Sequence, residues 1–262
     1  MDRILEIENL SLSFGGLQVL QEVALDAVRG GVTALIGPNG AGKTALLNCI
    51  SGIYRPQAGR IRFGGRDLVG LPPERVARLG IARSFQNLEL FPSLTVTENL
   101  LVARDGRFRG SVLEAAVFFG RPRRQEIDAR ETVEKVIDFF ELWPVRHVRA
   151  HDLPYGQQKI VGFARAMAAE PELLLLDEPG SGLTRDEKED LARFLLRLRY
   201  DWKVSVLWIE HDLQMVLDLA DRLHVLHLGQ CIASGAPHEV RQLPAVMKAY
   251  VGEAEAEPRA VA

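Results

Sequence analysis

Apolar and polar residues alternate along positions 4–36, with glycine-containing turns near residues 14–16 and 29–31. This alternation is typical of strands with one buried face, so it predicts antiparallel strands joined by turns. The uninterrupted apolar run at 32–36 predicts a strand buried on both faces, as in a parallel sheet. Further short strands are predicted near 61–63 and 79–86. The chain is therefore expected to open with a β-rich lobe.

A helical pattern replaces the strands from about residue 96 to residue 148. Apolar residues recur there at helical spacing, interrupted by glycines and a proline, which predicts an inserted helical lobe over about residues 88–168. Apolar runs at 173–176 and 204–209 then resume the parallel-sheet pattern. We therefore expect one α/β domain over residues 1–252. Residues 253–262 are charged and poor in large apolar side chains, which predicts a flexible tail.

Composition narrows the classes of protein to consider. The 262 residues are 47% hydrophobic, and the formal net charge of −3 gives no reason to expect nucleic acid as a partner. The only cysteines, Cys49 and Cys231, lie far apart in the sequence, which argues against a disulfide framework or a zinc site and fits a reducing cytosol. No signal-peptide pattern and no run of about 20 apolar residues is present. We expect the chain to reach a membrane only through a partner.

A phosphate-binding loop follows the apolar strand at 32–36 and precedes a helical pattern. It has the form G-x-x-x-x-G-K-[ST] and consists of Gly37, Pro38, Asn39, Gly40, Ala41, Gly42, Lys43 and Thr44, with Ala45 directly after it. Glycines let the backbone N–H groups point inward, and the helix N-terminus adds positive partial charge. Lys43 would reach the outer phosphates of a nucleoside triphosphate, and Thr44 would offer a hydroxyl to Mg²⁺.

Polar side chains follow the later apolar strands, where ligands bind in open α/β sheets. Asp177 and Glu178 end the run at 173–176; Asp177 suits Mg²⁺, and Glu178 could polarise a water for in-line attack on the γ-phosphorus. His211 ends the run at 204–209 and could contact the γ-phosphate and that water. Gln86 ends the strand near 79–86 and could place its amide oxygen near Mg²⁺ or water. Alone, each residue would more often be a polar strand end, but with the phosphate loop they predict an active site.

A second helix is predicted to begin near residues 153–158 and to stop near Pro171. Its N-terminus could also bind an anion. One chain cannot easily bring two such N-termini to a single nucleotide, whereas two chains arranged head to tail could complete each other's sites.

Together these motifs resemble those of the ATP-binding-cassette (ABC) ATPases, over nearly the whole chain. Residues 37–44 match the Walker A motif, 153–158 the signature, 173–179 the Walker B motif and 181–184 the D-loop, while Gln86 and His211 match the Q-loop glutamine and the switch histidine. The resemblance implies an α/β P-loop NTPase with a RecA-like core, an antiparallel β lobe and an inserted α-helical lobe. It also implies that Phe14 stacks on adenine.

The resemblance further implies ATP and Mg²⁺ as cofactors and ATP hydrolysis as the activity. Two ATPase subunits, identical or different, would sandwich two nucleotides and drive two transmembrane permease subunits at the cytoplasmic face of the bacterial inner membrane. A periplasmic or extracellular solute-binding protein would take part indirectly. The signature residues would then face the ATP of the partner subunit; they are Pro154, Tyr155, Gly156 and Gln157.

A finer resemblance is to the ATPase subunits of branched-chain amino acid importers and of related amide and urea uptake systems. It rests on residues 82–87 and 91–99, on the Tyr-Gly-Gln-Gln signature and on residues 244–252. An ATPase of an export or lipid-extraction system remains an alternative, as does an ABC protein that acts on ribosomes or in DNA repair. Neither a second cassette nor a long coiled-coil insertion, which the last class usually carries, is visible in the sequence.

This chain departs from the commoner family pattern at three positions. Pro154 stands where a serine would offer a hydroxyl to the partner's phosphate, although proline suits the first turn of a helix. Ala45 replaces a frequent hydroxyl residue, which removes a contact to the α-phosphate worth about 1 kcal/mol. Thr184 stands where the D-loop commonly carries an acidic or amide residue. We expect a working ATPase in which backbone amides and Lys43 carry more of the phosphate binding.

Overall fold

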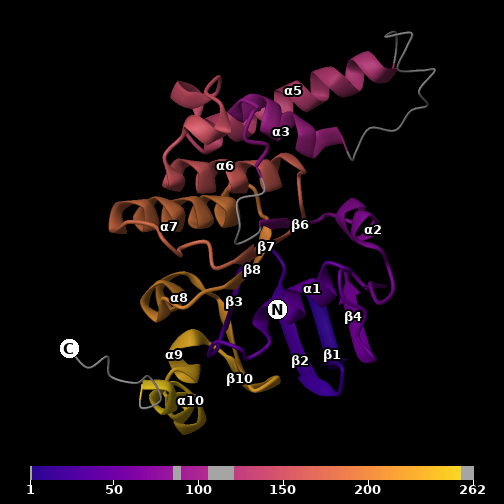
Figure 1. Cartoon of the computed structure of the whole chain (residues 1–262), viewed down its shortest axis with the longest axis vertical. Coiled ribbons are helices and arrows are strands. Elements are labelled where there is room, and N and C mark those ends of the chain that lie inside the picture. The colour runs from indigo at the N-terminus through magenta and orange to yellow at the C-terminus, as the bar shows by residue number, and fades with distance from the viewer. Residues whose placement is uncertain (1, 85–89, 106–120, 255–262) are drawn as a thin grey trace.

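A computed structural model of the chain describes residues 2–84, 90–105 and 121–254 (Figure 1). Within these residues the chain forms two sheets with helices packed around them, and this confirms the predicted α/β fold class. Gln86, expected at the end of the strand near 79–86, lies outside the described residues.

The first sheet is the antiparallel lobe that the alternating pattern predicts. Its strands are β1 (Arg3–Phe14), β2 (Leu17–Val28), β4 (Ala58–Phe63) and β5 (Arg66–Asp67), in the order β2-β1-β4-β5. Leu5, Ile7, Leu10 and Leu12 of β1 are buried, and the residues between them are mostly exposed or half-buried. The period of two, shifted by one residue at an irregularity between Ile7 and Leu10, therefore places one face of this sheet against the core.

The second sheet positions the site. Its order is β10-β9-β3-β8-β7-β6, and the strands are β3 (Val32–Ile36), β6 (Ile81–Ser84), β7 (Leu173–Asp177), β8 (Ser205–Ile209), β9 (Arg222–His227) and β10 (Gln230–Gly235). All neighbours pair in parallel except β9 and β10. Every residue of β3, β7 and β8 is buried, as their continuous apolar runs predict. The carboxyl ends of these three strands therefore meet at one edge of the sheet.

Helices cover both faces of the second sheet. On one face, the core around Leu173 and Leu175 includes α1 (Lys43–Ile50), α2 (Pro73–Arg78) and the first sheet. On the other, the core around Leu174 and Leu176 includes α6 (Tyr155–Ala168), α7 (Arg185–Tyr200) and α8 (Leu213–Leu219). Figure 1 shows α6 and α7 in layers between the sheet and the remaining helical lobe.

The helical lobe lies beyond α6. It contains α3 (Val96–Asp105), α5 (Arg121–Phe139) and the short 3-10 turns Trp143–Val145 and Ala150–Asp152. At the far end of the molecule, α9 (Pro237–Val240) and α10 (Pro244–Ala254) close the described chain. Since α10 ends at Ala254, its last two residues fall within the segment 253–262 that we expected to be a tail; residues 255–262 lie outside the described residues.

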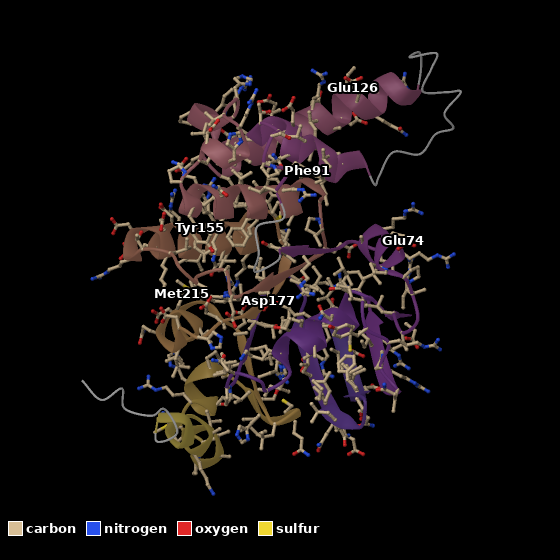
Figure 2. All side chains as sticks on the ribbon, in the orientation of Figure 1. Glu74, Phe91, Glu126, Tyr155, Asp177 and Met215 are labelled. Atoms are coloured by element: carbon tan, nitrogen blue, oxygen red, sulfur yellow. The ribbon has the colours of Figure 1, made fainter. Side chains whose placement is uncertain are left out.

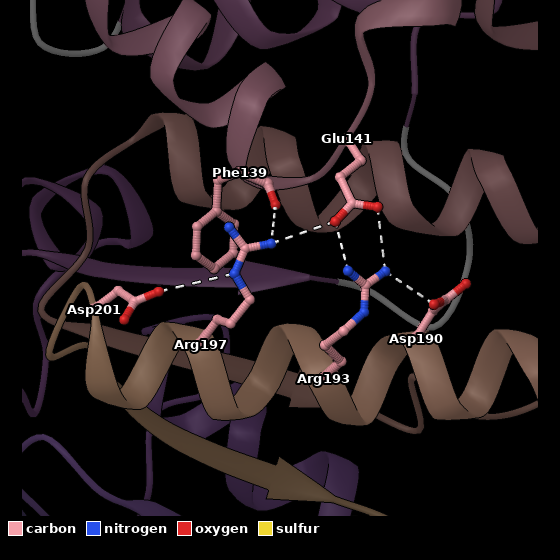
Figure 3. A network of polar contacts seen from close by, with 6 residues as sticks. All are labelled: Phe139, Glu141, Asp190, Arg193, Arg197 and Asp201. Atoms are coloured by element: carbon pink, nitrogen blue, oxygen red, sulfur yellow. Dashed lines mark hydrogen bonds and ion pairs between the residues drawn. The ribbon is translucent and has the colours of Figure 1, made fainter.

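Two arginines of α7 tie the end of α5 to the α/β core (Figure 3). Arg193 donates to both carboxylate oxygens of Glu141, and Arg197 donates from Nη1 to the Phe139 carbonyl at 2.9 Å. The hydrogen bond from Arg193 holds the pKa of Glu141 below its ordinary value. These side chains are partly exposed, so their ion pairs contribute little to the free energy of folding. Their main effect is to fix the orientation of the end of α5 relative to α7.

Candidate active site

The phosphate loop joins β3 to α1, as the sequence predicts. Helix α1 begins at Lys43, and its N-cap Gly42 has a φ of 102° and no capping side chain. Gly37 has a φ of 154°, and a Cβ there would lie 2.0 Å from the Leu226 carbonyl oxygen. A Cβ on Gly42 would lie 2.9 Å from both the Leu20 side chain and the Val19 carbonyl. Glycine is therefore required where the loop leaves β3 and where it enters α1.

The Lys43 side chain is buried within this loop. Its Nζ donates to the carbonyl oxygens of Gly37 at 2.6 Å and of Pro38 at 2.9 Å. A buried ammonium group beside an uncapped helix N-terminus makes this corner strongly positive, which suits an anion. Thr44 is exposed at the first turn of α1, and Ala45 packs against the core below it.

Asp177, the last residue of β7, forms a buried ion pair that sequence reasoning missed. Its Oδ2 accepts from Nη2 of Arg83 at 2.9 Å, and only 2% of the Asp177 side chain and 7% of the Arg83 side chain are exposed. Burial raises the pKa of Asp177, and Arg83 opposes that effect. Its Oδ1 is buried and has no hydrogen-bond partner among the described residues. The only sequence signal for this pair was a charged residue inside β6, which lies next to β7 in the sheet.

Glu178 and His211 meet at the ends of neighbouring strands. In the parallel pairing of β7 with β8, Asp177 lies opposite Ile209. The next residue, Glu178, donates its N–H to the Ile209 carbonyl at 3.0 Å. Nε2 of His211 lies 2.5 Å from Oε1 of Glu178. Glu178 has a φ of 49°, which is uncommon for a residue with a side chain and directs its carboxylate toward His211. The structure thus brings together two of the predicted catalytic residues, directly after Asp177, at the carboxyl ends of the strands next to β3; Figure 2 marks the place of Asp177.

Phe14 ends β1 and is half-exposed. Tyr54, which follows α1, packs edge-on against the Phe14 ring with 5.0 Å between the ring centroids. Phe14 pairs with Leu17 in the turn to β2, and the start of β2 contacts Gly42 through Val19. The Phe14 ring is therefore held on the phosphate-loop side of the antiparallel lobe.

Helix α6 packs on the opposite face of the second sheet from α1 and the phosphate loop (Figure 1). Pro154 is the N-cap of α6, one residue before the first turn in which we expected it. Pro154, Tyr155 and Gln157 are exposed, whereas Gly156 is buried and packs so closely on Glu187 of α7 that a Cβ would lie 1.8 Å from a carboxylate oxygen. One chain therefore presents two separate surfaces, one around the phosphate loop and one at the start of α6.

Comparison with known proteins decides the family. The ABC transporter profile matches residues 20–181. This chain belongs to the ABC transporter family. It is 41% identical over 253 residues to the high-affinity branched-chain amino acid transport ATP-binding protein BraF of Pseudomonas aeruginosa, covering 96% of this chain and 98% of the relative. The corresponding protein LivG of Salmonella typhimurium is 37% identical, with the same coverage of both chains.

Solved ABC cassettes share the fold. An ATP-binding cassette of an ABC transporter in its ADP conformation matches with a TM-score of 0.83 and 31% identity, over 96% of this chain and 100% of the cassette. A nucleotide-free cassette matches with a TM-score of 0.82 and 31% identity, over 95% and 99%. These findings confirm the sequence-based recognition and fold class, and they establish the chain as an ABC ATPase whose relatives are ATP-binding proteins of branched-chain amino acid transport. In the described ranges we find no helix with the length and apolarity of a membrane span.

In this ABC cassette, the D-loop threonine has a structural role that the sequence did not reveal. Thr184 is the N-cap of α7: its Oγ1 accepts from the Glu187 N–H, and its own N–H donates to Oε2 of Glu187 at 2.7 Å. The Thr184 hydroxyl also donates to the same Oε2, at 3.0 Å. In this reciprocal capping box the Thr184 hydroxyl both accepts and donates, which the carboxylate of an acidic residue at position 184 could not do.

The edge of the sheet also fits a divalent cation. The orphaned, buried Oδ1 of Asp177 is an unused oxygen ligand, and the Thr44 hydroxyl is exposed at the start of α1. Among the described residues no group of three or more His, Cys, Asp and Glu side chains could hold a metal ion by itself. Such a donor set suits Mg²⁺, which keeps several waters and takes few protein ligands together with substrate phosphates.

Proposed function

We propose that this chain is the ATP-hydrolysing subunit of an importer of branched-chain amino acids or of related small polar solutes. The 2.5 Å contact between Glu178 and His211 supports the proposal of hydrolysis, because it pairs a carboxylate with an imidazole at the carboxyl ends of β7 and β8. The substrate class is inferred from the branched-chain amino acid transport relatives BraF and LivG.

Binding of ATP is proposed to rest on the phosphate loop and the antiparallel lobe. The backbone N–H groups of Gly37 and of residues 39–45, together with the Lys43 ammonium, would hold the phosphates; Pro38 has no N–H to offer, and Lys43 is already buried among loop carbonyls. The exposed ring of Phe14 would stack on adenine, with Tyr54 fixing its orientation. Ala45 offers no hydroxyl, so its contribution is limited to its backbone.

Thr44, Asp177 and Gln86 are proposed to hold Mg²⁺. Mg²⁺ would neutralise negative charge on the phosphate oxygens as the γ-phosphoryl group is transferred. Arg83 fixes the Asp177 carboxylate through Oδ2, which leaves Oδ1 for the cation. Thr44 supplies its hydroxyl from the first turn of α1, next to Lys43. Gln86 lies outside the described residues, so its part in the proposal rests on its place after β6.

In the proposed reaction, Glu178 is the general base. Its carboxylate accepts a proton from the attacking water as the water oxygen bonds to the γ-phosphorus and the bond to the β,γ-bridging oxygen breaks. His211 contacts the Glu178 carboxylate through Nε2 and is proposed to turn to the γ-phosphate when ATP is bound. The left-handed backbone of Glu178 is strain of the kind stored at functional sites.

A second ATPase subunit, identical or homologous, is proposed to complete the site. Pro154, Tyr155, Gly156 and Gln157 cannot serve the phosphate loop of their own chain from the other face of the sheet, so they are proposed to face the partner's ATP. The uncapped start of α6 suits an anion there. The dimer would drive two transmembrane permease subunits at the cytoplasmic face of the inner membrane, with a solute-binding protein acting on the far side.

Glu178→Gln tests the hydrolytic part of this proposal. We expect the variant to bind a fluorescent ATP analogue with wild-type affinity and to lose hydrolysis by on the order of a hundredfold or more, because only proton acceptance is removed. Glu131→Gln, on an exposed position of α5, is the matched control and should retain full turnover. Near-normal hydrolysis by Glu178→Gln would remove Glu178 from the role of general base.

The substrate class is tested with the complete transporter in proteoliposomes. Leucine, isoleucine or valine together with the solute-binding protein should stimulate ATP hydrolysis and accumulate inside the vesicles. Stimulation by urea or short amides instead would assign the related uptake systems. Export of a vesicle lipid or solute, or recovery of the chain with ribosomes or DNA, would contradict the importer proposal.

A further inference from the structure

Two buried charges of opposite sign hold the loop that follows the general base. The segment consists of residues 179–183 and connects Glu178 to the N-cap of α7. Lys159 of α6 is 6% exposed, and Glu210, the residue after β8, is 4% exposed. Neither side chain has a salt-bridge partner among the described residues; both bind the backbone of this loop instead. We call residues 179–183 the D-loop segment; it overlaps the D-loop motif at 181–184 and ends just before Thr184.

Lys159 binds the D-loop segment from the side of α6. Its Nζ donates to the Pro179 carbonyl at 3.2 Å and to the Ser181 carbonyl, and these two residues flank Gly180. The ammonium group also lies 5.3 Å from the centre of the Tyr155 ring, one helical turn earlier on α6. Tyr155 in turn packs against Gly182, where a Cβ would lie 3.2 Å from the ring. The start of α6 therefore contacts the D-loop segment through a lysine and a tyrosine.

Glu210 binds the same segment from the side of the sheet. Its Oε2 accepts from the Gly180 N–H at 3.3 Å and from Nε1 of Trp208 at 3.2 Å. Its Oε1 accepts from the N–H of His211 at 3.1 Å. One buried carboxylate thus fixes both the middle of the D-loop segment and the backbone of the histidine that holds Glu178.

Burying these charges is costly, and this cost points to function. An ammonium or carboxylate that is taken out of water without a counter-ion loses solvation free energy, which backbone hydrogen bonds only partly restore. An apolar side chain of similar size would often be neutral or stabilising in such a place. The charges are therefore better explained by what they position, which is the short segment between the general base and the start of α6.

We infer that Lys159 and Glu210 are positioning residues for ATP hydrolysis, which fix the D-loop segment and through it the geometry of the Glu178–His211 pair. The inference rests on the proposed function, in which Glu178 is the general base. Since the start of α6 is also proposed to face the ATP of the partner subunit, Lys159 connects the surface that contacts one nucleotide to the residues that hydrolyse the other.

Lys159→Met tests the inference, because methionine keeps the length of the side chain and removes the charge and the donors. We expect a melting temperature equal to or above that of the wild type, unchanged affinity for a fluorescent ATP analogue, and a kcat that is lower by on the order of tenfold to a hundredfold. Lys159→Arg, which keeps a charged donor, should restore part of the kcat. Lys135→Met on an exposed position of α5 is the matched control and should behave as the wild type.

A second arm uses Glu210→Gln. In Glu210 both carboxylate oxygens accept hydrogen bonds, whereas the glutamine amide has only one acceptor oxygen. At least one of the N–H groups of Gly180, Trp208 and His211 therefore loses its acceptor. We expect kcat to fall, and we expect the double variant with Lys159→Met to lose less than the product of the single losses, because both side chains act through one segment. Independent, multiplicative losses would overturn a shared action through that segment.

Hydrogen exchange separates this inference from the proposed function. In Lys159→Met, peptides that cover residues 178–183 should exchange several-fold faster, while peptides that cover the phosphate loop should not change. If the wild type failed to hydrolyse ATP, the proposed function would fall, and the exchange of residues 178–183 would still decide whether Lys159 fixes them. Unchanged exchange in that segment, or a wild-type kcat in Lys159→Met, would overturn the inference.

Discussion

Arg83→Met should destabilise the chain more than any exposed substitution, because it leaves the Asp177 carboxylate buried without its counter-ion. The two side chains are 7% and 2% exposed, and their ion pair is 2.9 Å long. Removing one partner of such a pair costs about 3–5 kcal/mol. Arg83 also donates to Oδ1 of Asn48 at 2.5 Å, so methionine leaves this acceptor unpaired as well. Protonation of Asp177 limits the loss, and we expect about 3 kcal/mol at neutral pH.

The pH dependence of this loss has a definite sign. Burial already raises the pKa of Asp177, and Arg83, which opposes that effect, is absent from the variant. The folded variant therefore binds the proton at Asp177 more readily than the unfolded chain, so the contribution of Asp177 to stability is greatest at low pH and is lost as pH rises through the raised folded pKa. The difference between wild type and variant should accordingly shrink as pH is lowered from about 7 to 5.

Urea unfolding followed by circular dichroism, without nucleotide or metal, measures this loss. Arg78→Met, at an exposed position of α2, is the control and should stay within about 0.5 kcal/mol of the wild type. Adding Asp177→Asn to Arg83→Met removes the unpaired charge and should recover about 1–2 kcal/mol. A loss below about 1 kcal/mol in Arg83→Met, or no recovery in the double variant, would refute the reasoning.

Two further predictions concern buried polar side chains. Asn99→Leu should lower the free energy of unfolding by about 2–4 kcal/mol. The buried Asn99 amide accepts a hydrogen bond from the Phe91 N–H and donates to the carbonyls of Phe91, Leu94 and Thr95, and leucine leaves these groups unpaired. A loss below about 1 kcal/mol in a urea titration would contradict this. His224→Gln should flatten the pH dependence of stability below the ordinary His pKa of 6.5. Burial lowers the pKa of His224, so the wild type loses stability as pH falls below that value; equal slopes for both proteins in thermal melts would count against this.

The sequence predicted the parts of the site that depend on local pattern. A continuous apolar run, a glycine-rich loop and a helix identify β3, residues 37–44 and α1 without any tertiary information. Asp177, Glu178 and His211 were likewise found as polar residues after buried strands. Their meeting depends on the sheet order, in which β8 lies between β3 and β7. That order places Glu178 next to Ile209, and hence next to His211.

Contacts between distant segments could not be predicted in this way. Arg83 and Asp177 are 94 positions apart, and Gly180 and Glu210 are 30 positions apart. Nothing in the spacing of one sequence says which buried charges will share a partner. A charged residue within or directly beside an apolar run is the only available signal, and it applies to Arg83 and Glu210 alike. Lys159 lacks even that signal, because a lysine within an amphipathic helix is usually exposed.

The substitutions that set this cassette apart are consistent with a D-loop segment held by its own chain. The Thr184 hydroxyl both accepts from and donates to Glu187, and Gly156 packs directly on the Glu187 carboxylate. The capping box thus fixes the end of the segment that Lys159 and Glu210 hold at its middle. An acidic residue at position 184 would place a second carboxylate beside Glu187 and loosen both the cap and the contact with Gly156. A change at the start of α6 is therefore expected to reach Glu178 through the contacts of Lys159 and Glu210 with the backbone of the D-loop segment, all within one subunit. A contact of the side chain at position 184 across the dimer should matter little for this coupling.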